Sequence, residues 1–244
     1  MIIIILFLFL IIFIILFYCC DTFSVPNKIK IYSKNELINI LLKDNDGYIK
    51  SFNNNDFMAR NVNNKKEYNN SIINSCININ QKLKKKIIEQ IQVANSKFEL
   101  YNIIGFDGKK CNEISWNIGI VEGTQYENGY PHTRNNIIII PKSIINNNLY
   151  STLIHEKVHI YQKMYPNDIQ LYLNHNNFTK INTQTNTKLI NRANPDIDNN
   201  IYQDKNNNIL YCIYNNNPKN ISDVECSYSE HPFEFMAYFI QNNI

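Results

Sequence analysis

The chain has 244 residues, a formal net charge of +3, 18% charged residues and 44% hydrophobic residues. Asn and Ile together fill more than a third of its positions, which we attribute to AT-rich codon usage rather than to function. A weak net charge of mixed sign excludes an extended nucleic-acid-binding surface. The apolar and aromatic content is sufficient for a packed core, so the composition also excludes a wholly disordered chain.

The chain begins with an uninterrupted apolar segment. Residues 1–17 contain no polar side chain, and the first charged residue is Asp21. A segment of this length lies between a signal-peptide core and a short membrane span. By the positive-inside rule, Lys28 and Lys30 would hold the body in the cytosol. We nevertheless expect residues 1–20 to be a signal peptide or membrane anchor of a secreted or membrane-anchored protein.

Cysteines and sequons are the two features of the body that favour export. After residue 20 an even set of four cysteines remains, which allows two disulfides in one of three connectivities. They are Cys76, Cys111, Cys212 and Cys226. Sequons at Asn69, Asn177 and Asn220 predict a glycoprotein, although three sequons are close to chance in so Asn-rich a chain.

The hydrophobic pattern predicts a mixed α+β body. In chain order, we expect a helix over 34–42, a loop over 53–70, an amphipathic helix over 81–93, a strand over 114–121, a buried strand over 137–140, a helix over 149–165 and a last helix from Pro232. Residues 166–229 are Asn-rich and show no long periodic segment. The lysines within 82–86 are interpreted as a solvated helix face rather than as phosphate contacts.

The helix over 149–165 contains His155-Glu156-Lys157-Val158-His159, an H-E-x-x-H motif. Residues four apart lie on one face of a helix, so both imidazoles can bind one tetrahedral Zn²⁺. Glu156 lies beside the first histidine, where it can take a proton from an attacking water and pass it to a leaving amine. The alternative is a solvent-facing helix in which the three residues coincide by chance.

This motif resembles that of the zinc metallopeptidases called zincins, and the resemblance covers residues from about 114 to the end of the chain. It implies a zincin-like catalytic region over 114–244, with a small sheet, an active-site helix, one Zn²⁺ and a peptide or protein substrate. Zincins place a substrate-pairing edge strand before the active helix, and Ile137–Ile140 is expected to be that strand. The part over 21–113 is then either a pro-segment or an N-terminal lobe.

The third zinc ligand decides the subgroup of zincin. The metzincin continuation fails, because Gln162 and Tyr165 stand where that pattern has Gly and His. Gluzincins take a Glu from a later helix, and Glu234 with Ala237 three residues later resembles their E-x-x-A pattern. The alternatives to Glu234 are Glu230 and Asp168.

Two further residues are candidate contacts of the substrate or the transition state. His132 lies just before the expected edge strand, and its alternative role is that of a loop or surface histidine. Tyr238 lies one turn beyond Glu234, where it could donate a hydrogen bond to an oxyanion or to a ligand histidine. Its alternative role is that of a core tyrosine.

The resemblance implies a zinc metallopeptidase in which His155, His159 and Glu234 hold the ion and Glu156 is general base and then acid. One alternative is a catalytically silent zincin fold that serves as a surface or secreted binding protein. The intact Glu156 argues against it, because a site without activity has no use for a base. Another alternative is an exported, disulfide-stabilised binding module in which the motif is coincidental.

Overall fold

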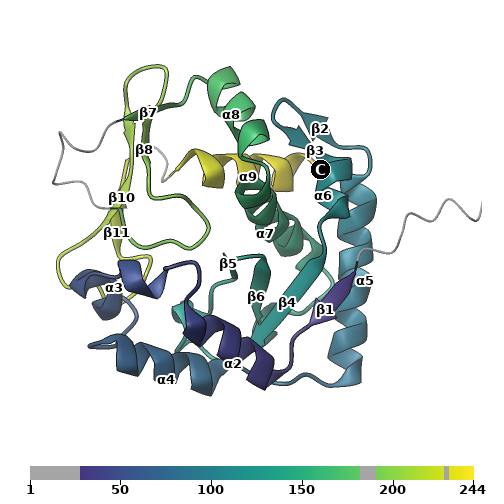
Figure 1. The fold of residues 1–244 in the computed structure, drawn as a ribbon, viewed down its shortest axis with the longest axis vertical. Helices are drawn as coiled ribbons and strands as arrows, with labels where there is room; N and C mark the ends of the chain where they lie inside the picture. The colour runs from purple at the N-terminus through teal and green to yellow at the C-terminus, as the bar shows by residue number, and fades with distance from the viewer. Residues whose placement is uncertain (1–27, 182–190, 228–230) are drawn as a thin grey trace, which may run out of the picture.

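The computed structural model describes residues 28–181, 191–227 and 231–244. The apolar segment 1–20 and the alternative ligand Glu230 lie outside these ranges, so what the sequence predicts for them stays a prediction. Within the described ranges, no helix has both the length and the apolar character needed to span a membrane. Helices and small sheets form the α+β architecture that the sequence predicts (Figure 1).

The regular elements are mostly short. The α-helices are α2 (Lys34–Lys43), α3 (Asn54–Met58), α4 (Lys65–Ser75), α5 (Gln81–Phe98), α6 (Gly108–Glu113), α7 (Leu149–Met164), α8 (Pro166–His175) and α9 (Pro232–Asn243). The strands are β1 (Ile29–Ile31), β2 (Asn102–Ile103), β3 (Phe106–Asp107), β4 (Trp116–Val121), β5 (His132–Arg134), β6 (Ile137–Pro141), β7 (Thr179–Ile181), β8 (Ile201–Gln203), β9 (Ile209–Leu210), β10 (Cys212–Tyr214) and β11 (Val224–Cys226).

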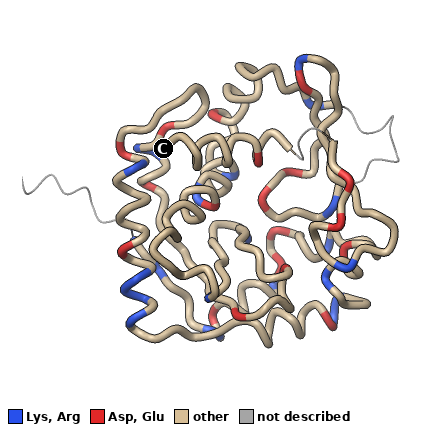
Figure 2. Tube along the Cα trace, turned by 180° about the vertical axis from the view of Figure 1, so that it is seen from behind, with Lys and Arg blue, Asp and Glu red and all other residues tan. Residues whose placement is uncertain are grey.

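Most elements with a clear hydrophobic period are confirmed. The predicted helices are α2, α5, α7 and α9, and the predicted strands are β4 and β6. Helix α5 continues to Phe98, beyond its predicted end. Lysines follow one another along α5 (Figure 2), and Lys82, Lys84 and Lys85 are exposed, as expected for a solvated helix face.

One prediction about an Asn-rich segment is wrong, and a second Asn-rich segment holds a helix for which the sequence made no prediction. The segment 53–70, expected to be a loop, contains α3 and most of α4, because its asparagines serve as helix caps. Asn53 accepts hydrogen bonds from the first turn of α3, and Asn64 caps α4 in the same way. Residues 166–229 hold a helix of ten residues, α8, because Pro166 occupies a first helical position where its missing N–H costs nothing.

The central sheet has the strand order β1-β4-β6-β5. Strands β1, β4 and β6 run parallel, and β5 turns back antiparallel to β6. The turn contains Asn135 with φ 54°, a left-handed conformation that Asn tolerates better than most residues. The expected edge strand, Ile137–Ile140, is therefore an interior strand, and β5 occupies the edge.

Helices cover both faces of this sheet, which explains why every residue of β6 is buried. Ile138 and Ile140 pack into the cluster formed with α5, α7 and α9, whereas Ile137 and Ile139 pack into the cluster formed with α2 and α4. Side chains alternate between the faces of a strand, so a run of isoleucines fills both cores. Figure 1 shows α7 and α9 on one side of the sheet and α2 and α4 on the other.

The four cysteines in the described residues form one disulfide instead of the two that their number allows. Cys212 and Cys226 lie directly opposite each other on β10 and β11 and are bonded. Cys76 and Cys111 are free and buried. They cannot meet, because Cys76 belongs to the cluster on the α2/α4 face of the sheet and Cys111 to the cluster on the other face.

A buried ion pair joins the segment 21–113 to the rest of the chain. Arg60, at the end of α3, donates from Nε to Glu127 Oε1 (2.8 Å) and from Nη2 to Glu127 Oε2 (2.9 Å). Tyr48 and Tyr68 donate to the same carboxylate. Arg60 also donates to the carbonyl of Ala193 (3.1 Å), so the network reaches the segment 191–198, which contacts Glu234.

This network predicts a step in acid stability. Burial acts to raise the pKa of Glu127, but the charge and hydrogen bonds of Arg60 outweigh burial and lower it from 4.5 to about 2. A lowered carboxyl pKa stabilises the fold above pH 4.5, and this stabilisation is lost as the pH falls from 4.5 to 2. We expect its loss to cost on the order of 3 kcal/mol in the free energy of unfolding.

Denaturant unfolding of wild type and Glu127→Gln at several pH values between 7 and 2.5 measures the step. The variant should be less stable at pH 7 and should lose less stability on acidification than wild type. Glu89→Gln, at an exposed position on α5, serves as the control that keeps the wild-type profile. Equal slopes for wild type and Glu127→Gln would contradict the expected role of the pair.

Candidate metal centre

Helix α7 places two imidazoles side by side. His155 and His159 are one turn apart, and their Nε2 atoms are separated by 3.1 Å. The helix contains neither Gly nor Pro, and Leu153, Ile154 and Val158 bury its apolar side in the core. Packing therefore fixes the helix, and His159 is fully buried while His155 is partly exposed.

Helix α9 brings Glu234 to these histidines. The helix begins at Pro232, and the side chain of His231 caps it by accepting a hydrogen bond from a backbone N–H of the first turn (3.2 Å). His231 is itself held by Asp198, with 3.1 Å between Nε2 and Oδ1. The cap fixes where the helix begins, and Glu234 lies in its first turn, beside α7.

Three potential ligand atoms converge where α7 and α9 meet. Glu234 Oε2 lies 3.4 Å from His155 Nε2 and 3.6 Å from His159 Nε2. In a tetrahedral zinc site with bonds of about 2.0–2.1 Å, neighbouring ligand atoms lie about 3.3 Å apart. Two imidazole nitrogens and one carboxylate oxygen are also a donor set of catalytic zinc sites. Among the described residues, no second group of His, Cys, Asp or Glu converges in this way.

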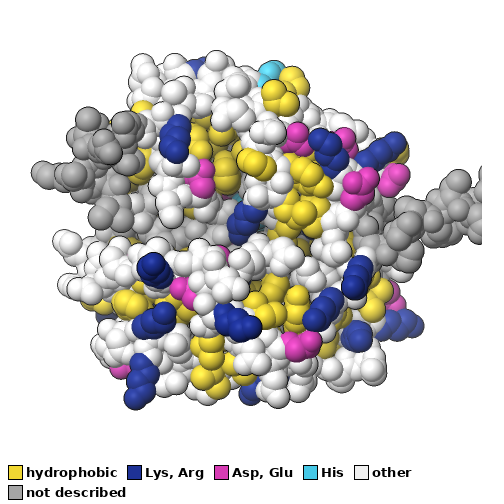
Figure 3. Space-filling view, viewed as in Figure 1, with side chains coloured by type: hydrophobic (Ala, Val, Ile, Leu, Met, Phe, Trp, Pro, Cys, Tyr) yellow, Lys and Arg dark blue, Asp and Glu magenta, His cyan; other side chains and the backbone are white. Residues whose placement is uncertain are grey.

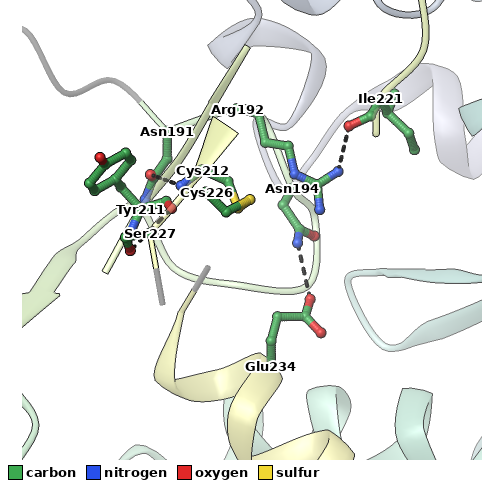
Figure 4. The surroundings of a disulfide bond; sticks show 9 residues. All are labelled: Asn191, Arg192, Asn194, Tyr211, Cys212, Ile221, Cys226, Ser227 and Glu234. Carbon is green, nitrogen blue, oxygen red and sulfur yellow. Dashed lines mark hydrogen bonds between the residues drawn. A yellow bond between two sulfur atoms is a disulfide. The ribbon is translucent and has the colours of Figure 1, made fainter. Parts of the chain in front are cut away.

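The other oxygen of Glu234 is held by the segment 191–198. Asn194 Nδ2 donates to Glu234 Oε1 (3.0 Å), as Figure 4 shows. This segment is attached to the disulfide-bonded hairpin, because the N–H of Arg192 donates to the carbonyl of Cys212 (2.8 Å). The carboxylate is thereby turned so that one oxygen faces the histidines and the other faces Asn194.

The charges of the three groups are strongly linked. Burial acts to raise the pKa of Glu234, but the charge of His159 and hydrogen bonds from both histidines hold that pKa well below its usual value. Burial acts to lower the pKa of His159, yet the carboxylate of Glu234 outweighs it and raises the pKa to about 9. Glu234 therefore creates a strong site for positive charge, which a proton on His159 occupies at neutral pH.

Glu156 is the carboxyl group beside this cluster that lacks a full set of partners. The residue is 3% exposed, and its Oε2 is buried without a hydrogen-bond partner. Burial and the nearby charge of Asp196 raise the pKa of Glu156 well above its usual value. A buried acceptor without a partner is costly unless a bound group satisfies it.

A cavity of about 960 Å³ is lined by His155, Glu156 and Glu234. Three aromatic residues of α9 also line it, and all three are exposed: Phe235, Tyr238 and Phe239. The space-filling view shows hydrophobic side chains exposed over α9 (Figure 3). The candidate centre therefore lies in the wall of a cavity large enough for several residues of an extended ligand.

The outer edge of β5, which pairs with no other strand of the sheet, is covered by the segment 191–198 near the candidate metal centre. The N–H and the hydroxyl of Thr133 both donate to Asp196 Oδ1, each at 2.6 Å. Lys163 Nζ donates to Thr133 Oγ1 (2.6 Å) and to the carbonyl of Pro195 (2.7 Å). The carboxylate of Asp196 thus accepts the hydrogen bond of the Thr133 backbone N–H that an exposed edge strand would otherwise offer to a partner strand.

His132 is not a surface histidine and Tyr238 is not a core tyrosine, which were the alternative roles considered for them. His132 lies on β5, is buried and contacts Tyr130 O (3.0 Å) and Tyr126 OH (3.1 Å) through its two ring nitrogens, so it is no surface histidine. Burial lowers its pKa. Tyr238 is exposed rather than part of the core, and its ring centroid lies 4.5 Å from that of His155. Both residues line the cavity, and their contact with a substrate stays a prediction.

The structure brings His155, Glu156, His159 and Glu234 together, whereas Asp168 lies elsewhere. The carboxylate of Asp168 contacts Lys110 (3.0 Å) and Tyr161 (2.5 Å) instead. Four residues contact the centre or its surroundings without having been predicted from the sequence to do so, namely Gln162, Asn194, Asp196 and Gln241. Only Gln162 carried a local signal, since it lies one turn after His159.

If the three converging atoms bind zinc, we expect the apparent zinc affinity to depend steeply on pH. Zinc binds the neutral imidazole, so it must displace the proton that Glu234 holds on His159. The apparent affinity should rise about tenfold per pH unit up to about pH 9 and then level off, because one proton is released. Competition with a chromophoric chelator from pH 6.5 to 9.5 measures the curve. In Glu234→Gln, binding should be weaker and should level off at a lower pH, whereas a flat wild-type curve between pH 7 and 9 would exclude the expected proton displacement.

No protein-family model, no curated protein and no solved structure matches the chain. The function proposed below therefore rests on the geometry of the centre and on its sequence motif.

Proposed function

We propose that the protein is a zinc-dependent peptidase that hydrolyses peptide bonds with a water activated at the centre of His155, His159 and Glu234. The observation that carries the proposal is the convergence of three ligand atoms, at pairwise distances of 3.1, 3.4 and 3.6 Å, beside the buried Oε2 of Glu156. The zincin-like H-E-x-x-H motif supports the same function.

Each residue of the centre has a defined role in this proposal. His155, His159 and Glu234 would hold a zinc ion, which would lower the pKa of a bound water to about 7 and polarise a substrate carbonyl. Glu156 takes a proton from the attacking water and passes it to the nitrogen of the leaving amine. Burial suits Glu156 to this transfer, because a carboxyl group with a raised pKa holds and releases a proton closer to neutral pH.

We place the peptide in the cavity rather than along β5. The outward N–H of Thr133 already donates to Asp196, so a substrate strand would first have to displace that carboxylate. The cavity offers Phe235, Tyr238 and Phe239 beside the centre, and these side chains suit a substrate with apolar groups.

An exported body is part of the proposal. The disulfide between Cys212 and Cys226 is consistent with an oxidising compartment, where such bonds persist. Of the three sequons, the one at Asn177 presents an exposed asparagine, whereas Asn69 and Asn220 are partly buried. Asn177 is therefore the site at which we expect a glycan.

The test is metal analysis of the full-length protein, followed by digestion of a peptide library with wild type and Glu156→Gln. We expect about one zinc ion per chain and cleavage that a chelator abolishes and zinc restores. Glu156→Gln should keep its zinc and cleave about 10²–10⁴-fold more slowly, because proton transfer contributes that much to such reactions.

The control is again Glu89→Gln, which should cleave like wild type. Zinc without cleavage of any peptide would favour the silent binding protein instead, and no zinc would favour the disulfide-stabilised binding module. Unchanged cleavage by Glu156→Gln would remove Glu156 from the mechanism while leaving the metal centre in place.

A further inference from the structure

The second ring nitrogen of each centre histidine is bound by a glutamine. His159 Nδ1 lies 2.9 Å from Gln162 Oε1, and His155 Nδ1 lies 3.0 Å from Gln241 Oε1. Gln162 belongs to α7 and is buried, whereas Gln241 belongs to α9 and is partly exposed. The two glutamines thus come from different helices but make the same contact.

The orientation of the Gln162 amide is fixed by its second contact. Its Nε2 donates to the backbone carbonyl of Phe233 (2.9 Å), which can only accept a hydrogen bond. The NH₂ group must therefore face Phe233, and the amide oxygen must face His159. Because that oxygen can only accept, His159 carries a proton on Nδ1, and its neutral form has a lone pair on Nε2, towards Glu234.

The two glutamines also hold α7 and α9 together. Gln162, on α7, reaches the carbonyl of the residue just before Glu234 on α9. Gln241, on α9, reaches back to Ser151 Oγ on α7 (2.9 Å). Each glutamine that orients a histidine therefore also bonds to the opposite helix.

We infer that Gln162 and Gln241 are positioning residues of the metal centre, which fix the tautomer of the two histidines and direct both Nε2 atoms at the zinc ion. The inference rests on the proposed function only in that zinc binds at this centre. Partners of this kind, hydrogen-bonded to metal ligands, typically change metal affinity about 10–100-fold when they are removed.

The test compares two substitutions of Gln162 in the full-length protein. Gln162→Leu removes both hydrogen bonds, whereas Gln162→Glu keeps an acceptor for His159 Nδ1 but loses the donor to Phe233. Zinc affinity is measured by chelator competition, and the geometry of the centre by the visible absorption of the Co²⁺-substituted protein. Gln170→Leu, at an exposed position of α8, is the matched control.

If Gln162 positions His159, Gln162→Leu binds zinc about 10–100-fold more weakly and changes the Co²⁺ spectrum, while Gln162→Glu and the control stay near wild type. Equal losses in both Gln162 variants would overturn the inference, because they would show that only the contact with Phe233 matters. If Gln162→Leu does not fold, the same pair of substitutions at the partly exposed Gln241 decides the question.

Failure of the inference is distinguishable from failure of the proposed function. Tight zinc binding by wild type that neither Gln162→Leu nor Gln241→Leu weakens would overturn the positioning role alone. A wild-type protein that binds no zinc would overturn both, and zinc binding does not require any peptide to be cleaved.

Discussion

The contact between α7 and α9 is the interaction on which the candidate centre depends. One helix carries both histidines, but the carboxylate that completes the set comes from the C-terminal helix and lies within 3.6 Å of both imidazoles. Met236, Ala237 and Ile240 are fully buried on α9 and belong to the same core cluster as the apolar side of α7. Apolar burial therefore holds the two helices in contact, and the cap by His231 fixes where α9 begins.

Buried charged groups with a structural role differ from the candidate functional group, Glu156, in how they are paired. The buried guanidinium of Arg60 is paired with Glu127, and that of Arg134 with Asp44 and Asp46. Such pairing is required, because a charge buried without a partner costs several kcal/mol. Glu156 and Arg134 each keep one buried polar atom without a hydrogen-bond partner, but of the two only Glu156 lines the cavity. A buried titratable side chain that lacks such a partner and lines a cavity is typical of a functional site.

Long-range contacts link this centre to the rest of the fold. The segment 191–198 carries Asn194 to Glu234 and Asp196 to Thr133, and the N–H of Ala193 ties it to Asp56 on α3. None of these contacts has a sequence signal, because they join residues far apart in the chain through an Asn-rich segment without hydrophobic period. The contact of Gln241 with His155 likewise has no sequence signal, because the two residues lie far apart in the chain.

Features that depend on spacing within one element follow from the amino-acid sequence alone. The helical period placed His155, Glu156 and His159 together, and the runs of apolar residues located α5, α7, β4 and β6. The groups that meet across different elements are set by the tertiary structure. It put Cys76 and Cys111 on opposite faces of the sheet, it made β6 interior by folding β5 back onto it, and it brought Glu234 rather than Asp168 to the histidines. The physical reason is that local periodicity records which face of an element is buried, whereas the partner against which that face packs is set by the whole core.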